Sequence, residues 1–175
     1  SVAVRALSQP LCGRTRPTHF GGVCTVVLKL LNSVMPNVMY LGQKDYQQFR
    51  VLSQLVKDLD FPTKVRLCPI VREPDGLAMS SRNIFLTSIE RTEALVLSRA
   101  LRTARRLVKA GACDGTRIRK TALSALNKAS HGRLDYLEIV HDDTLEPMVK
   151  LAPGDRVLIA VAMSFGKTRL IDNCL

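Results

Sequence analysis

The chain has 175 residues, of which 46% are hydrophobic and 23% are charged. This length predicts one ordinary domain or two small ones, and the composition is typical of a folded soluble protein rather than a disordered one. No segment is apolar for long enough to span a bilayer, so we expect no membrane association. The net charge of +11 points to anionic substrates or polyanionic partners.

The five cysteines form no C-x-x-C pair, and the three histidines lie far from any pair of cysteines. An odd number of cysteines without such pairs is typical of a reducing compartment, and we therefore expect a cytoplasmic protein. Structural zinc requires closely spaced thiolate or imidazole ligands, so the sequence predicts no zinc site. We assign no residue as a metal ligand.

Helices and strands alternate in the predicted structure of the first 70 residues. Apolar residues recur at helical spacing over 22–34 and predict a helix that stops before Pro36, although the β-branched content leaves a strand possible. A short apolar run over 38–41 predicts a buried strand, a second helix covers 49–59, and a second strand covers 65–68. This order predicts βαβ connectivity and a parallel sheet covered by helices.

The character of the sequence changes after a Pro-Asp-Gly turn signal at 74–76, and we place a domain boundary at residue 72. Thr87 and Glu90 have the spacing of a capping box, which predicts that a basic helix begins there and ends near Gly111. A further helix is predicted over 116–129, followed by strands at 134–141, 156–163 and 168–172. Two helices and three strands indicate a small α+β domain.

Residues 99–120 contain eight lysines and arginines but a single acid. At about 100° per residue the cations Arg99, Arg102 and Arg106 fall opposite the apolar residues Leu97 and Leu101. We favour a solvated basic helix face over a nucleic-acid site, because tryptophan is absent and few aromatic side chains could stack on bases.

The first candidate site is Gly42-Gln43-Lys44-Asp45, where a predicted strand passes into a helix. Open α/β sheets bind ligands at the carboxyl ends of their strands. Gly42 allows a ligand to approach the backbone, Lys44 offers a charge to phosphate, and Asp45 can accept hydrogen bonds from ribose hydroxyls. The alternative is that Asp45 merely caps the helix.

Two further clusters have the composition of anion sites. Ser80, Ser81 and Arg82 offer two hydroxyls and one guanidinium on a predicted mobile loop whose side chains have no evident partner in the chain. Arg16 and His19 precede a glycine pair at a helix start. Taken alone, the serine-rich segment is better explained as a polar linker between domains.

Taken in order, these segments resemble the pantothenate synthetase family of the nucleotidyltransferase superfamily. The resemblance is carried by residues 16–23, 42–48, 75–83 and 169–173. The sequence departs from the usual family pattern at Thr18, Gly21 and Gln43. The segments 57–61 and 135–140 are more similar to plant-type than to bacterial members.

The resemblance implies an α/β fold with two parts, a partial Rossmann-like nucleotide-binding domain over 1–72 and a small α+β domain over 73–175. It further implies ATP-dependent ligation of pantoate and β-alanine through a pantoyl adenylate, with Mg²⁺ assisting and a homodimeric assembly, and no nucleic-acid or membrane partner. The family's first half, with its H-x-G-H motif, has no counterpart here. The chain therefore resembles a C-terminal portion, and we expect the activity to be incomplete in these residues alone.

The resemblance also implies residue roles. Catalytic contacts to the ATP phosphates are implied for Lys44, Ser80, Ser81 and Arg82. The nucleotide site further includes Gly42, Gln43 and Asp45 near the ribose, and Val71 and Met79 near the adenine. Pantoate binding is implied for Gln48, with Arg16 and His19 lining the substrate site.

Two other functions stay open at this point. The missing H-x-G-H segment would fit a non-catalytic remnant that retains the fold and a dimer-forming surface. The basic residues 99–120 would fit an RNA-binding module, whose affinity should fall steeply with salt.

Overall fold

The computed structural model describes residues 2–175 and divides into two compact units, residues 1–69 and residues 70–175. No helix in the described part of the chain is long and apolar enough to cross a membrane.

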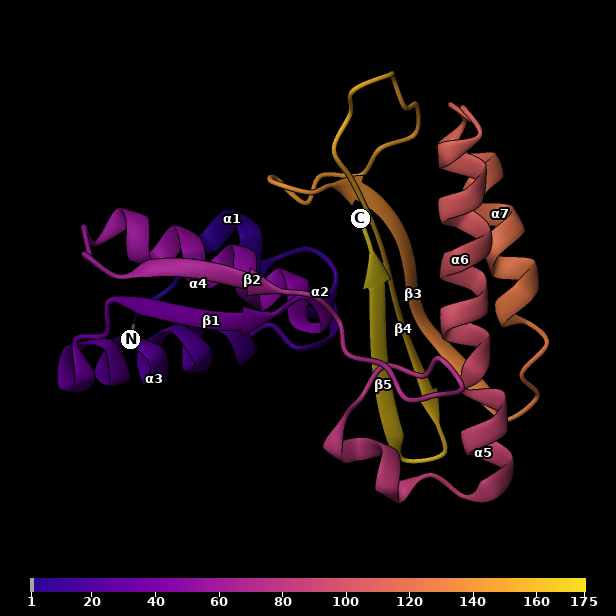
Figure 1. The fold of residues 1–175 in the computed structure, drawn as a ribbon, viewed down its shortest axis with the longest axis horizontal. Coiled ribbons are helices and arrows are strands. Elements are labelled where there is room, and N and C mark those ends of the chain that lie inside the picture. The colour runs from indigo at the N-terminus through magenta and orange to yellow at the C-terminus, as the bar shows by residue number, and fades with distance from the viewer. Residues whose placement is uncertain (1) are drawn as a thin grey trace. The chain divides into compact units, whose positions relative to one another are not determined.

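The N-terminal unit is organised around two parallel strands that lie side by side with their arrowheads at the same end (Figure 1). Val38 pairs with Lys64 at one end and Gly42 pairs with Cys68 at the other. The chain between the strands contains a helix, so the predicted βαβ connectivity and parallel pairing are confirmed. The elements are α1 (Arg5–Ser8), α2 (Cys12–Thr15), α3 (His19–Val34), β1 (Val38–Gly42), the 3-10 helix η1 (Gln43–Asp45), α4 (Tyr46–Asp58) and β2 (Lys64–Cys68).

Helix α4 forms because its apolar residues recur on one face, which buries Val51, Leu52 and Leu55. The segment 22–34 is a helix rather than a strand, as predicted, but α3 begins three residues earlier and takes a glycine pair into its first turn. It ends where Met35 adopts a left-handed conformation with φ of 47°, directly before Pro36.

The C-terminal unit pairs three antiparallel strands in the order β3-β4-β5 with α6 and α7, which lie beside the sheet (Figure 1). Side chains from both layers, among them Leu97, Leu101, Val161 and Phe165, are buried in one hydrophobic core. The elements are η2 (Ser81–Phe85), α5 (Ser88–Glu93), α6 (Leu95–Lys109), α7 (Gly115–Leu126), β3 (Gly132–His141), β4 (Val157–Phe165) and β5 (Thr168–Cys174). The predicted succession of two long helices and three strands is confirmed.

The capping box is present but opens a different helix from the one predicted. Thr87 accepts a hydrogen bond from the Glu90 N–H while the Glu90 side chain accepts one from the Thr87 N–H, and this pair begins the short helix α5. The basic helix α6 starts separately after Ala94, whose C=O accepts a tight-turn hydrogen bond from the Leu97 N–H. No local pattern signalled this break, because Ala94 is compatible with a continuous helix.

Candidate functional site

The carboxyl end of β1 carries the first predicted cluster. Lys44 Nζ lies 3.1 Å from Asp45 Oδ2, and the lysine side chain is only 17% exposed. Asp45 stands at the N-cap position of α4 but makes no capping hydrogen bond with its side chain. The structure therefore does not support the helix-cap interpretation of Asp45, and instead shows an ion pair at the strand end where α/β sheets bind ligands.

A buried glutamine that the sequence analysis missed lies beside the predicted Gln48. Gln47 accepts a hydrogen bond from the Cys12 N–H at 3.0 Å, and its Nε2 donates to the carbonyl oxygens of Leu7 and Pro10. Gln47 thereby fastens the N-terminal segment to the first turn of α4. The available signal was helical spacing, since Gln47 precedes the buried Val51 by four residues. Gln48 is half-buried.

The predicted Arg16 and His19 contact each other at the start of α3. Arg16 Nη2 lies 3.1 Å from His19 Nδ1, and Arg16 is exposed. The His19 ring is tilted against Phe20 with centroids 5.0 Å apart. The two residues thus form one polar cluster at a helix N-terminus.

In the C-terminal unit, residues 71–79 form a tight antiparallel turn. The Gly76 N–H donates to the Glu73 C=O, which confirms the predicted Pro-Asp-Gly turn, and Gly76 takes the positive φ of 96°. The Met79 N–H donates to the Val71 C=O at 3.0 Å. The two apolar residues implied for the adenine side are therefore neighbours, and their side chains are 65% and 54% exposed.

The serine-rich segment is not the unanchored loop that the sequence suggested, because it folds into η2. Ser80 caps this helix by accepting a hydrogen bond from the Arg82 N–H. Asn83 Nδ2 donates to Glu73 Oε1 at 2.7 Å and to the Ala78 C=O at 3.1 Å. The expectation that the polar side chains of the loop over residues 79–83 lack partners is wrong for Ser80 and Asn83. Ser81 and Arg82 are exposed.

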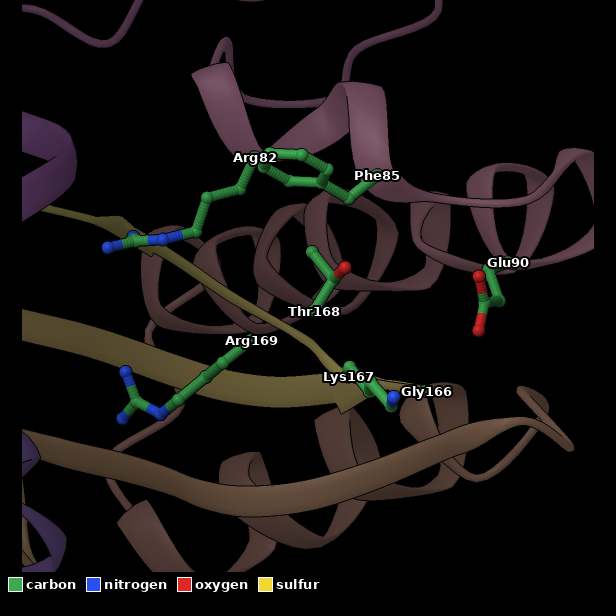
Figure 2. A pocket seen from close by; sticks show the side chains of 7 residues that line it. All are labelled: Arg82, Phe85, Glu90, Gly166, Lys167, Thr168 and Arg169. Carbon is green, nitrogen blue, oxygen red and sulfur yellow. The ribbon is translucent and has the colours of Figure 1, made fainter.

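A pocket of about 680 Å³ in the C-terminal unit is lined by Arg82, Phe85, Glu90, Gly166, Lys167, Thr168 and Arg169 (Figure 2). The guanidinium groups of Arg82 and Arg169 extend toward the same side, while Glu90 lies toward the other. Three cations against one carboxylate make this lining favourable for anions. Arg169 is oriented by Asp135, whose Oδ2 accepts hydrogen bonds at 2.9 and 2.6 Å.

A second ion pair anchors the segment that leads to η2. The Arg72 guanidinium donates to both oxygens of Asp172 on β5, at 2.7 and 2.9 Å, and to the Gly76 C=O. Hydrogen bonding to the buried Asp172 raises the pKa of Arg72, so the guanidinium stays charged. Asp172 is not among the site residues predicted from the sequence.

Within residues 2–175, no group of three or more histidine, cysteine, aspartate or glutamate side chains could hold a metal ion. Mg²⁺ is usually bound by one or two carboxylates together with substrate phosphates. Asp45, the carboxylate beside the predicted phosphate contact Lys44, is paired with that lysine. The described residues thus contain no metal site made of protein ligands alone.

The family model described as pantoate-beta-alanine ligase matches residues 1–175. The chain belongs to the pantoate-beta-alanine ligase family. It is 52% identical over 169 residues to the pantothenate synthetase of Thermotoga neapolitana, covering 97% of this chain and 60% of the relative. It is 47% identical over 174 residues to that of Acetivibrio thermocellus, covering 99% of this chain and 61% of the relative.

Two solved structures of the pantoate-beta-alanine ligase family are also similar. Pantothenate synthetase from Thermus thermophilus superposes with a TM-score of 0.93 at 42% identity, over 99% of this chain and 62% of that one. The Francisella tularensis ligase, solved with beta-gamma ATP and beta-alanine, gives a TM-score of 0.71 at 35% identity, over all of this chain and 58% of that one. The chain thus spans about 60% of the length of these relatives. All four are bacterial, so the expected plant-type lineage is not supported.

Proposed function

We propose that the protein ligates pantoate and β-alanine to pantothenate at the expense of ATP. The observation that carries this proposal is the match of the ligase family model to residues 1–175. Two features of the structure support it: the Lys44–Asp45 pair at the carboxyl end of β1, and the turn that presents Ser81 and Arg82 to solvent.

The proposed chemistry has two steps. A pantoate carboxylate oxygen attacks the α-phosphorus of ATP, the bond from that phosphorus to the bridging oxygen breaks, and pyrophosphate leaves. The β-alanine amine then attacks the carboxyl carbon of pantoyl adenylate and loses a proton, while AMP departs with the bond-breaking electrons. No side chain has to become a nucleophile, so catalysis depends on positioning and on neutralising phosphate charge.

The residue roles follow the family pattern. Lys44 would neutralise phosphate charge, and Ser80, Ser81 and Arg82 would donate hydrogen bonds to phosphate oxygens. The ribose would be contacted by Gly42, Gln43 and Asp45, and the adenine by Val71 and Met79. Pantoate would be bound by Gln48, and the substrate site would be lined by Arg16 and His19. We further propose that residues 1–72 are part of a Rossmann-like nucleotide-binding domain and that the protein forms a homodimer. Mg²⁺ is expected with ATP, and no step is assigned to it.

The test uses an extended protein, defined as these 175 residues joined to the part of the Thermotoga neapolitana relative that the match does not cover. That part is placed ahead of residue 1, because the resemblance implies that the family's first half has no counterpart here. Pyrophosphate release is measured with pantoate and ATP. We expect turnover by the extended protein and none by the 175 residues alone. Absence of pantoate-dependent release from the extended protein would contradict the proposal and favour the non-catalytic alternative.

Lys44→Ala tests the site within the extended protein. Removing one charged donor from a developing phosphate charge costs roughly 3 kcal/mol, so the adenylation rate should fall about 100-fold or more. Lys57→Ala is the matched control, because Lys57 lies exposed in the last turn of the same helix that begins beside Lys44. A Lys44→Ala rate within threefold of the parent would show that Lys44 does not contact the phosphates.

A further inference from the structure

Asn83 connects η2 to the preceding turn through two hydrogen bonds from one amide group. Its Nδ2 donates to Glu73 Oε1 at 2.7 Å and to the Ala78 C=O at 3.1 Å. Asn83 directly follows Arg82, so fixing its side chain fixes the backbone that carries the Arg82 guanidinium. The bond to Glu73 is charge-assisted and belongs to the stronger class of hydrogen bonds.

Glu73 is itself held in place by a second helix. Arg91 on α5 donates to Glu73 Oε2 at 2.7 Å and lies equally close to Asp75 Oδ2. The hydrogen bond from Asn83 and then that from Arg91 lower the pKa of Glu73, so the carboxylate remains charged at neutral pH. Arg91, Glu73 and Asn83 therefore form a chain of contacts from α5 to η2.

η2 also lies against β5, but it adds no side chain to the hydrophobic core. It contains no buried residue, and the side chains of Ile84 and Phe85 are 79% and 69% exposed. A five-residue 3-10 helix is short and has strained hydrogen bonds, so its shape depends on contacts outside the helix. The chain of contacts through Asn83 adds hydrogen bonds to the packing of η2 against β5.

We propose that Asn83 is a positioning residue for the ligation reaction: anchored on Glu73, it holds η2 so that Ser81 and Arg82 meet the triphosphate in a fixed geometry. This inference rests on the proposed function. An exposed arginine on a mobile turn would have to be ordered each time ATP binds, whereas an anchored turn is ordered beforehand. The core of the C-terminal unit does not include Asn83, so the anchor can be removed without emptying that core.

The kinetic test compares Asn83→Ala with its parent in the extended protein. We expect kcat/KM for ATP to fall about 10-fold or more, KM for β-alanine to stay within about twofold, and the melting temperature to stay within about 2 °C. Asn127→Ala is the matched control, since Asn127 is exposed at the end of α7 and should leave all three quantities unchanged.

Two combinations show whether Asn83 acts through its neighbours. Glu73→Gln retains an acceptor oxygen for Asn83, so its kcat/KM for ATP should stay within about threefold of the parent value. Glu73→Ala should lower kcat/KM as much as Asn83→Ala does. The double variant Glu73→Ala/Asn83→Ala should be no worse than either single variant. In an Arg82→Ala background, Asn83→Ala should add less than about twofold. Additive losses in these combinations would overturn the proposal.

Hydrogen exchange of the 175-residue chain tests the anchor without any turnover. The Asn83 N–H donates to the Ser80 C=O, and the Leu86 N–H donates to the Asn83 C=O. Asn83→Ala should therefore speed hydrogen exchange of a peptide covering 81–86 at least tenfold, while the exchange rate of a β4 peptide stays unchanged. Unchanged exchange would refute the anchor even in an inactive protein. If the parent is active and Arg82→Ala impairs it but Asn83→Ala does not, the positioning role fails while the proposed function stands.

Discussion

Replacing Asp172 with asparagine should destabilise the C-terminal unit more than the same change at Asp135, a less buried acid that is also paired with an arginine. The Asp172 side chain is 1% exposed, and both of its oxygens accept hydrogen bonds from Arg72. Its Oδ1 also accepts from the Asn173 N–H at 2.8 Å. Asp172→Asn keeps the shape but removes the negative charge and places an amide donor against a guanidinium.

The size of the effect follows from burial. Removing one partner of a fully buried ion pair costs about 3–5 kcal/mol, because the other charge is left uncompensated. The Arg72 side chain is 31% exposed, so water can recover part of that cost. We therefore expect a loss of about 2 kcal/mol, which for a unit of roughly 100 residues corresponds to a melting temperature about 10 °C lower.

Urea unfolding monitored by hydrogen exchange of a β4 peptide reports on the C-terminal unit alone. Asp135→Asn is the matched control, because Asp135 is also paired with an arginine but its side chain is 17% exposed. We expect the control to lose less than about 1 kcal/mol. A loss at Asp172 no greater than that at Asp135 would refute the reasoning from burial.

Two further predictions concern the same unit. Gly166→Ala and Gly154→Ala should each destabilise it by about 1–2 kcal/mol in thermal melts, because the two glycines have positive φ values of 54° and 94° that alanine adopts only with backbone strain. Unchanged stability at either position would contradict this reasoning. Hydrogen bonds from the Ser130 hydroxyl and then the His131 ring lower the pKa of Glu93 to about 2. The ionised Glu93 carboxylate therefore stabilises the folded state fully above its ordinary pKa of 4.5, and this stabilisation is lost as the pH falls toward 2. The stability gap between the parent and Glu93→Gln, measured by urea unfolding, should close between pH 5 and pH 2, and a constant gap would contradict this.

Local patterns predicted the elements well because burial repeats with the period of each element. The basic helix shows this, since Leu97 and Leu101 are buried while Arg102 and Arg106 are exposed, as the spacing indicated. The apolar run over 38–41 correctly located a strand, but the expectation that this strand is buried is wrong, because none of its residues is buried and Tyr40 is 69% exposed.

Contacts between distant residues left no such signal. Arg72 and Asp172 are 100 positions apart, and Asn83 reaches back ten positions to Glu73. Neither pairing repeats with a structural period, so only the three-dimensional fold shows it. Gln47 does lie at helical spacing from a buried residue, but its polar side chain suggested a solvent-facing position. Only its hydrogen-bond partners show why it is buried.

The fate of the pantoate carboxylate oxygens tests the proposed reaction most directly. The extended protein is supplied with ATP, β-alanine and pantoate labelled with ¹⁸O in its carboxylate, and the AMP is analysed by mass spectrometry. Attack of the carboxylate on the α-phosphorus, followed by displacement at the carboxyl carbon, transfers one labelled oxygen to AMP. We expect AMP that carries one ¹⁸O atom. Unlabelled AMP, or ADP together with labelled phosphate, would contradict the pantoyl-adenylate route.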